Sequence, residues 1–169
     1  MRTLLLAIGM LTAAVSSVAA QTVNGITVTN AGSYKADTTS APARSGQLSP
    51  TGTIGTDSHW QFTSDSLDVH GKVGTHFGVE FRIDGAPSGE GVTLYLALTF
   101  PPQGIRNPNT GEIMYSNRIA FPNMKIGALC VLGYGFDTEW EIVPGMWTAQ
   151  VWYKDHMLAE RSFTVAKAN

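Results

Sequence analysis

Apolar and polar side chains alternate along much of this sequence, most densely between Tyr134 and Val165. In this segment Trp147, Val151 and Tyr153 share one face of an extended chain, and the residues between them share the other. Successive side chains of a β-strand point to opposite faces, so a period of two predicts strands that are buried on one side. We expect the last part of a β-sandwich here, with a turn at residues 144–145.

The same alternation recurs upstream. Phe77 to Ile83 alternates with charged residues and glycine, and Val92 to Phe100 alternates with small or hydroxyl side chains. Glycine- and proline-rich turns separate these runs, and no segment shows the 3.6-residue period of a helix. This pattern is typical of antiparallel sheets rather than of an α/β fold. We therefore predict an all-β chain that folds as a single antiparallel β-sandwich.

The closing hairpin is predicted from its register. A three-residue loop at residues 154–156 sets Tyr153 opposite Met157 and Trp147 opposite Phe163. A slip of one residue would turn every side chain to the other face. The three-residue loop is therefore the expected connection.

The same register pairs Trp152 with Leu158 on the outer face of the hairpin. Two large apolar side chains there are either covered by a loop or form an exposed patch, and exposed apolar patches tend to be binding sites. Trp152 and Leu158 are thus the candidate binding residues.

The N-terminus has the pattern of a secretory signal peptide. Arg2 precedes an apolar run from Leu4 to Leu11, and Val18-Ala19-Ala20 is a small-residue cleavage site. We expect cleavage after Ala20, which would leave Gln21 first in a periplasmic or secreted chain. The apolar run is shorter than the roughly 20 residues of a membrane-spanning helix, and we expect no membrane span.

Composition divides the remaining chain in two. Residues 21–58 are predicted to hold a first strand and a flexible loop rich in Ser, Thr, Gly and Pro, most mobile from Thr38 to Pro50. Residues 59–169 are predicted to form the sandwich core. Cys130 is the only cysteine, and we expect it to be a small buried side chain.

Charge limits the classes of partner. Without Arg2, ten basic residues stand against 13 acidic ones, a net charge of −3. Nucleic acids and anionic lipids attract basic surfaces, so neither is an expected partner.

A family resemblance rests on short motifs in a characteristic order. They are Phe100-Pro101-Pro102, Asn107-Pro108, Thr110-Gly111, Gly133-Tyr134, Phe136-Asp137, Trp140-Glu141, Val143-Pro144-Gly145, Trp147-Thr148, Trp152-Tyr153 and Leu158-Ala159-Glu160. In these motifs the chain resembles the bacterial domain-of-unknown-function family 3859, from about Phe77 to Val165. The resemblance implies a small exported immunoglobulin-like (Ig-like) sandwich. The family has no assigned activity, so the resemblance supplies no catalytic residues and leaves the function open.

Three carboxylates form the candidate metal site. Asp137, Glu139 and Glu141 would share one face of an extended strand, where carboxylate oxygens could bind Ca²⁺. The alternative is an acidic outer face that keeps strand edges from pairing with other chains.

Histidine and methionine suggest a second kind of metal site, for Cu or Zn. The side chains in question are His59, His70, His76, His156, Met114, Met124, Met146 and Met157. A periplasmic metal-handling protein is therefore an alternative function, although no pair has a recognised ligand spacing.

The sequence contains none of the common catalytic motifs. The sequence has no Gly-x-Ser-x-Gly elbow, His-Glu-x-x-His helix, Cys-x-x-Cys pair or phosphate loop. A hydrolase with a dispersed Ser, His and Asp site is a lesser alternative. The leading expectation is a non-catalytic, cofactor-free module that binds or scaffolds an envelope protein or glycan.

Overall fold

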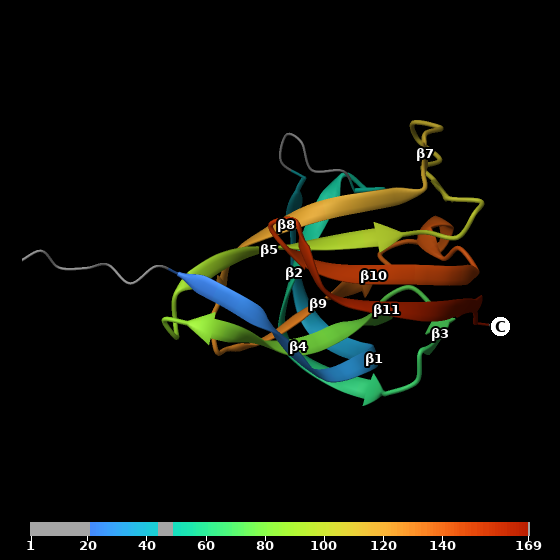
Figure 1. Cartoon of the computed structure of the whole chain (residues 1–169). Coiled ribbons are helices and arrows are strands. Elements are labelled where there is room, and N and C mark those ends of the chain that lie inside the picture. The colour runs from blue at the N-terminus through green and yellow to red at the C-terminus, as the bar shows by residue number, and fades with distance from the viewer. Residues whose placement is uncertain (1–20, 44–48, 169) are drawn as a thin grey trace, which may run out of the picture.

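The computed structural model describes residues 21–43 and 49–168, which form eleven strands and one short 3-10 helix (Figure 1). The elements are β1 (Thr22–Pro42), β2 (Thr53–Ser64), β3 (Asp68–Gly71), β4 (His76–Ala86), β5 (Gly91–Thr99), β6 (Ile105–Arg106), β7 (Ile113–Met114), β8 (Ser116–Lys125), β9 (Leu129–Gly135), η1 (Glu139–Glu141), β10 (Gly145–Tyr153) and β11 (His156–Lys167).

These strands build two sheets that pack face to face. Sheet A has the order β2-β1-β4-β9 and sheet B the order β3-β11-β10-β5-β8, while β6 and β7 form a separate short hairpin. Every pairing in the two sheets is antiparallel except that of β11 with β3. The prediction of an all-β sandwich is confirmed, with one parallel pair at the edge of sheet B.

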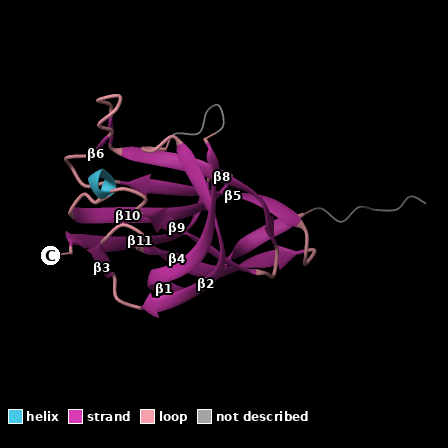
Figure 2. Cartoon of the chain, turned by 180° about the vertical axis from the view of Figure 1, so that it is seen from behind, coloured by secondary structure: helices cyan, strands magenta, loops and turns pink. Residues whose placement is uncertain are grey.

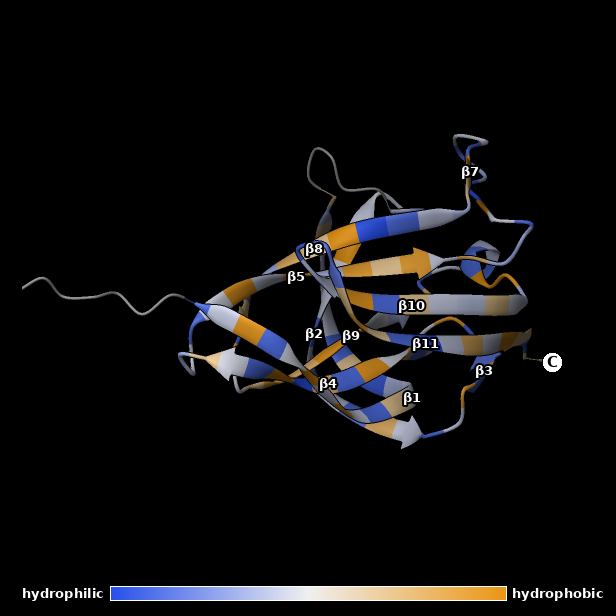
Figure 3. Ribbon diagram, in the orientation of Figure 1, coloured by the Kyte–Doolittle hydropathy of each residue, from blue (hydrophilic) through white to orange (hydrophobic). Residues whose placement is uncertain are grey.

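Alternation places the core between the sheets. Along β5, Val92, Leu94, Leu96 and Leu98 are all buried, while the residues between them are at least partly exposed. The same banding of hydrophobic and hydrophilic residues is visible along β4 in Figure 3. Apolar area removed from water is the main stabilising term for such a fold.

Trp147 on β10 lies at the centre of the core and is fully buried. Its ring is 4.9 Å from that of Phe100, 5.5 Å from Phe77 and 5.7 Å from Phe136, centroid to centroid. These aromatic pairs are edge-to-face, an arrangement that the ring quadrupoles favour. The indole N–H donates to the Val143 carbonyl oxygen at 2.9 Å, so the buried polar atom is satisfied.

The closing hairpin keeps the predicted core register but not the predicted loop. Trp147 pairs with Phe163 as expected. The loop has two residues rather than three, because Tyr153 pairs with His156 and Lys154 adopts a left-handed conformation (φ 54°). An irregularity between Val151 and Trp152 absorbs the extra residue, as a β-bulge does.

Strands occupy part of the segment predicted to be a flexible loop, where residues 38–42 belong to β1, while residues 44–48 lie outside the described residues. β1 pairs with β4 through its first half, and its second half pairs with β2 from Ser33–Ser64 to Pro42–Thr53. We call the two-stranded part at residues 35–42 and 53–61 the β1–β2 arm. Its outer half is largely exposed on both faces, so it has no apolar stripe to reveal it. Threonine, with its β-branched side chain, is nevertheless a strand former.

Glycine allows a close approach of β9 to β4. Gly133 pairs with Gly78, and a Cβ on Gly133 would collide with the Phe77 carbonyl oxygen and the Gly78 Cα. The two backbones therefore lie directly against each other here.

Truncation of Trp147 tests the position of the core. Trp147→Ala should lower the free energy of unfolding by about 3–5 kcal/mol, the range for a fully buried aromatic side chain. Chemical denaturation measures the change. Met146→Ala is the matched control, since Met146 is 63% exposed, and it should change the free energy by less than about 0.5 kcal/mol. Equal effects of the two substitutions would contradict the described core.

Candidate functional site

One side of the sandwich is not closed by a strand. β9 is the last strand of sheet A and β8 the last strand of sheet B, and the two do not pair with each other. The β1–β2 arm runs across this side toward β8 (Figure 2). A polar cavity and an apolar groove lie between these three elements, and both are lined by residues of all three.

Asp57 holds the base of the arm. Its carboxylate accepts hydrogen bonds from the Tyr34 hydroxyl at 2.6 Å and from the Thr38 hydroxyl at 2.7 Å. The His76 ring lies 3.7 Å away. Burial alone would raise the pKa of Asp57, but hydrogen bonds from His76, Thr38 and Tyr34 outweigh it and hold the pKa below its usual 3.8. The cluster ties the arm to the start of β4.

The loop at the far end of the arm reaches the β6–β7 hairpin. The Asn107 side-chain amide, between β6 and β7, donates to the Pro50 carbonyl oxygen at 2.9 Å. Three hydroxyl side chains lie next to Pro50. The Thr51 hydroxyl is 3.1 Å from that of Ser49 and 2.9 Å from that of Thr53. This end of the arm closes part of the open side and presents hydroxyl groups there.

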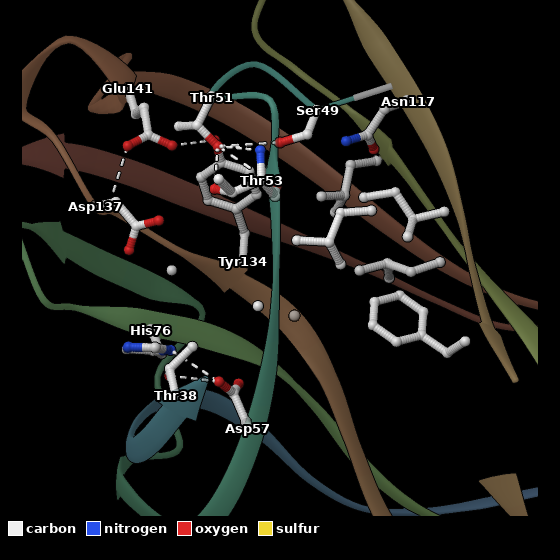
Figure 4. A pocket seen from close by; sticks show the side chains of 18 residues that line it. Thr38, Ser49, Thr51, Thr53, Asp57, His76, Asn117, Tyr134, Asp137 and Glu141 are labelled. Atoms are coloured by element: carbon white, nitrogen blue, oxygen red, sulfur yellow. Dashed lines mark hydrogen bonds and ion pairs between the residues drawn. The ribbon is translucent and has the colours of Figure 1, made fainter. Parts of the chain in front are cut away.

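The polar cavity has a volume of about 80 Å³ and is shown in Figure 4. Its polar lining comes from the arm and the adjoining residues 49–51, from β4, β8 and β9, and from the segment around η1. It consists of Thr38, Ser49, Thr51, Thr53, Asp57, His76, Asn117, Tyr134, Asp137 and Glu141. Apolar side chains of β5 and β8 form the rest of its wall.

Glu141 is the most buried acid of the described residues, at 1% exposure. The Tyr134 hydroxyl donates to its Oε1 at 2.6 Å, while the Thr138 amide (2.7 Å), the Thr138 hydroxyl (2.8 Å) and the Asp137 amide (3.0 Å) donate to its Oε2. Burial raises the pKa of Glu141 despite these donors, and burial next to Glu141 raises the pKa of Tyr134 well above 10.

The prediction that Asp137, Glu139 and Glu141 share one face of an extended strand is therefore wrong. Glu139–Glu141 form the helix η1, so the three carboxylates point to different surroundings. Glu141 is buried, Asp137 is exposed, and Glu139 lies 3.5 Å from Lys167. The backbone turns because Glu141 caps the amides of Asp137 and Thr138, a local bond that competes with extended structure.

Histidine and acid side chains do not gather elsewhere in the described part of the chain. His59 lies 3.2 Å from Asp37, and His156 lies 3.4 Å from Asp155, both at the surface. Within residues 21–43 and 49–168, no group of three His, Cys, Asp or Glu side chains is placed to hold a metal ion.

Asn117 lines the polar cavity but was not among the residues predicted from the sequence to form a site. It lies on β8 opposite Leu98, and it is only 6% exposed. Neither its Oδ1 nor its Nδ2 has a hydrogen-bond partner among the described residues. A signal was present, because Asn117 precedes Ile119 by two residues and so occupies an inward position of an alternating strand.

The apolar groove adjoins the cavity and measures about 270 Å³. It is lined by residues of β2, β8 and β9 and of the turn before β9. These are Gly55, Thr56, Asp57, Trp60, Phe121, Asn123, Met124, Lys125, Ala128, Leu129, Cys130, Val131, Leu132 and Gly133. Leu129 is 41% exposed in this groove, whereas Cys130 is buried, as predicted. Burial raises the pKa of the Cys130 thiol.

The structure does not make Trp152 and Leu158 cross-strand partners. Trp152 pairs with Met157, and its indole N–H donates to the Gln150 side chain at 3.1 Å. The Arg118 guanidinium lies 5.3 Å from the Trp152 ring and 4.6 Å from the neighbouring Tyr95 ring. Leu158 packs against the core instead.

The two sheets pack face to face around a central tryptophan, and their strands are antiparallel except for β3 and β11. This arrangement is that of an Ig-like β-sandwich. The fold is similar to the crystal structure of an immunoglobulin-like protein from Pseudomonas aeruginosa, with a TM-score of 0.56 and 22% identity over 89% of this chain and 100% of that chain. None of the curated proteins compared with the chain matches it significantly.

The chain belongs to the family described as Domain of unknown function (DUF3859), whose model matches residues 25–165. The resemblance predicted from the sequence is thus confirmed, and it extends through the N-terminal third. No described helix is long and apolar enough to cross a membrane.

Acid titration tests the Asp57 cluster. Asp57→Asn should lower the free energy of unfolding at neutral pH by about 1–3 kcal/mol, because an amide nitrogen cannot accept the tyrosine and threonine protons. Asp57 has a depressed pKa in the folded protein, so its contribution is present above pH 3.8 and is lost as pH falls through the lower folded value. The wild-type and variant curves should therefore converge below pH 3.8.

The exposed Asp155 provides the control, with a side chain that is 86% exposed. Asp155→Asn should leave both the stability and its pH dependence unchanged. A constant gap between wild type and Asp57→Asn down to the lowest pH would contradict the assigned role of the carboxylate.

Proposed function

We propose that this chain is an exported, non-catalytic binding module of the bacterial envelope, and that it holds an extended polypeptide segment in the apolar groove beside β9. The observation that carries the proposal is the position of the groove, which lies between the terminal strands of both sheets.

Strand addition is the binding mode that this geometry favours. A terminal strand presents backbone N–H and C=O groups along its outer edge, and an extended peptide can pair with them. Alternate side chains of such a peptide would enter the groove over Leu129, Val131 and Phe121, which line it. Backbone pairing supplies affinity in this mode, and the side-chain pockets supply selectivity.

The lining selects the chemistry of the partner. Most lining side chains are apolar, with Met124, Leu132 and Trp60 among them. Asp57 and Lys125 are the charged members of the lining, one of each sign. A segment with apolar residues at every second position and little net charge therefore fits better than a glycan. The partner inferred here is an envelope protein.

Peptide selection tests the groove. Random peptides displayed on phage and panned against the mature protein should converge on sequences with alternating apolar residues. Leu129→Glu should weaken binding of a selected peptide by roughly tenfold or more, because it places a charge against apolar side chains. The free energy of unfolding should change by less than about 0.5 kcal/mol, as for other exposed positions.

Leu67→Glu is the matched control, since Leu67 is 40% exposed and lies outside the groove. It should leave peptide binding unchanged. Peptide-induced NMR shifts should map to residues 129–135. Shifts centred on Tyr95, Arg118 and Trp152 would contradict the groove and favour the outer face of sheet B. Failure to enrich any sequence would also count against the proposal.

Export is tested by the mature N-terminus. The positive, apolar and small-residue regions of the first twenty residues support cleavage after Ala20. Protein recovered from the envelope fraction should begin at Gln21 by N-terminal sequencing. Leu6→Asp, which interrupts the apolar run, should leave the chain uncleaved. Retention of the first twenty residues in the wild-type protein would contradict export by this route.

A further inference from the structure

The polar cavity contains an amide that the fold leaves without a partner. Both polar atoms of the Asn117 side chain are buried, and neither is hydrogen-bonded to any part of the described chain. Most buried polar groups in proteins are paired, because an unpaired one loses its hydration without compensation. Figure 4 shows Asn117 among the side chains that line the cavity. A hydrogen-bond donor in the cavity would give the Asn117 amide oxygen the partner that it lacks.

Charge selects the kind of molecule. Asp57, Asp137 and Glu141 line the cavity, and the described lining includes no lysine or arginine, with His76 as its one basic side chain. An anion would meet carboxylates there, whereas a cation would find acceptors. Three His, Cys, Asp or Glu ligands do not converge on one point in the described structure, so the site suits a molecule better than a metal ion.

The volume and the apolar wall of the cavity limit the size and the chemistry of a ligand that could bind there. Leu96, Leu98, Ile119 and Phe121 line the cavity opposite its polar groups. The volume of about 80 Å³ corresponds to roughly five water molecules, or a small molecule with about as many non-hydrogen atoms. Exposed Thr38, Gly55 and Asp137 are among the lining residues, so the cavity is not sealed from solvent.

We propose that this cavity is a binding site for a small organic cation: a primary ammonium group on a short apolar stem. The ammonium group carries three N–H donors. Asn117 Oδ1 accepts one of them. The hydroxyl oxygens of Ser49, Thr51 and Thr53 can accept the others. Two of the lining carboxylates already accept hydrogen bonds from the protein, and all three contribute by attracting the positive charge. The stem lies against the leucine side chains of β5. The cavity adjoins the groove and shares Asp57 and Phe121 with it, but this proposal does not depend on peptide binding there.

Matched ligands test the charge and the stem together. n-Butylammonium, 1-butanol and butyrate each contain four carbon atoms but differ in charge. Each ligand is titrated into the mature protein by isothermal titration calorimetry at constant ionic strength. n-Butylammonium should bind with one-to-one stoichiometry and raise the melting temperature, and butyrate should do neither. 1-Butanol should bind at least roughly tenfold more weakly, since it lacks the charge. Equal binding of the ammonium and the alcohol, or no binding of either, would overturn the proposal.

Asn117→Leu tests the contact itself. It replaces the amide by an apolar group of similar size, so the ligand-free protein should melt at the same temperature or higher. Affinity for n-butylammonium should nevertheless fall by roughly tenfold or more. Asn24→Leu, at an exposed position of β1, is the control and should bind as the wild type does. Unchanged affinity in Asn117→Leu would overturn the assignment.

A measurement on the wild-type protein covers the case in which Asn117→Leu does not fold. The side-chain amide resonances of Asn117 should shift on addition of n-butylammonium, and those of exposed Asn24 should not. Ligand-induced shifts that leave Asn117 unaffected would place the binding elsewhere and overturn the proposal.

Discussion

The open side of the sandwich determines where the arm, the cavity and the groove lie. Two sheets that pack around Trp147 leave an interior exposed where β8 and β9 end the sheets without pairing. The β1–β2 arm covers part of that side, and Asp57 fastens it to Tyr34 and Thr38. The cover is incomplete, and the cavity and the groove are what remains open. Fold and candidate function thus arise from the same feature.

The strands were predictable where one face is buried and the other is not. Leu94 and Leu96, or Phe81 and Ile83, reveal their strands because burial imposes a period of two. The outer half of the arm has water on both faces, so hydroxyl-rich composition suggested a loop where the backbone forms a ladder. The closing hairpin shows a related limit. Its core register followed from Trp147 and Phe163, but a bulge allowed a shorter loop than the pattern required.

The site was less predictable than the fold because it depends on exceptions to the pattern. Glu141 was expected on a solvated strand face, yet it is buried by its own local bonds to Thr138 and by the Tyr134 hydroxyl. Asn117 breaks the apolar period of β8, because a polar side chain stands at an inward position two residues before Ile119. Trp152 was predicted to form an outer patch with Leu158, whereas Arg118 and Gln150 already contact its ring and N–H group. Residues far apart in the chain meet at the cavity, and spacing alone could not bring them together.

Exchange of the β9 backbone amides is the most direct test of an open side. On a terminal strand every second N–H points away from the neighbouring strand, and only the paired ones are protected. Hydrogen exchange followed by NMR on the mature protein should therefore show alternating slow and fast amides between Leu129 and Gly135. Uniformly slow exchange along β9 would show that its outer edge is already covered, and would contradict the account of this side as a binding surface.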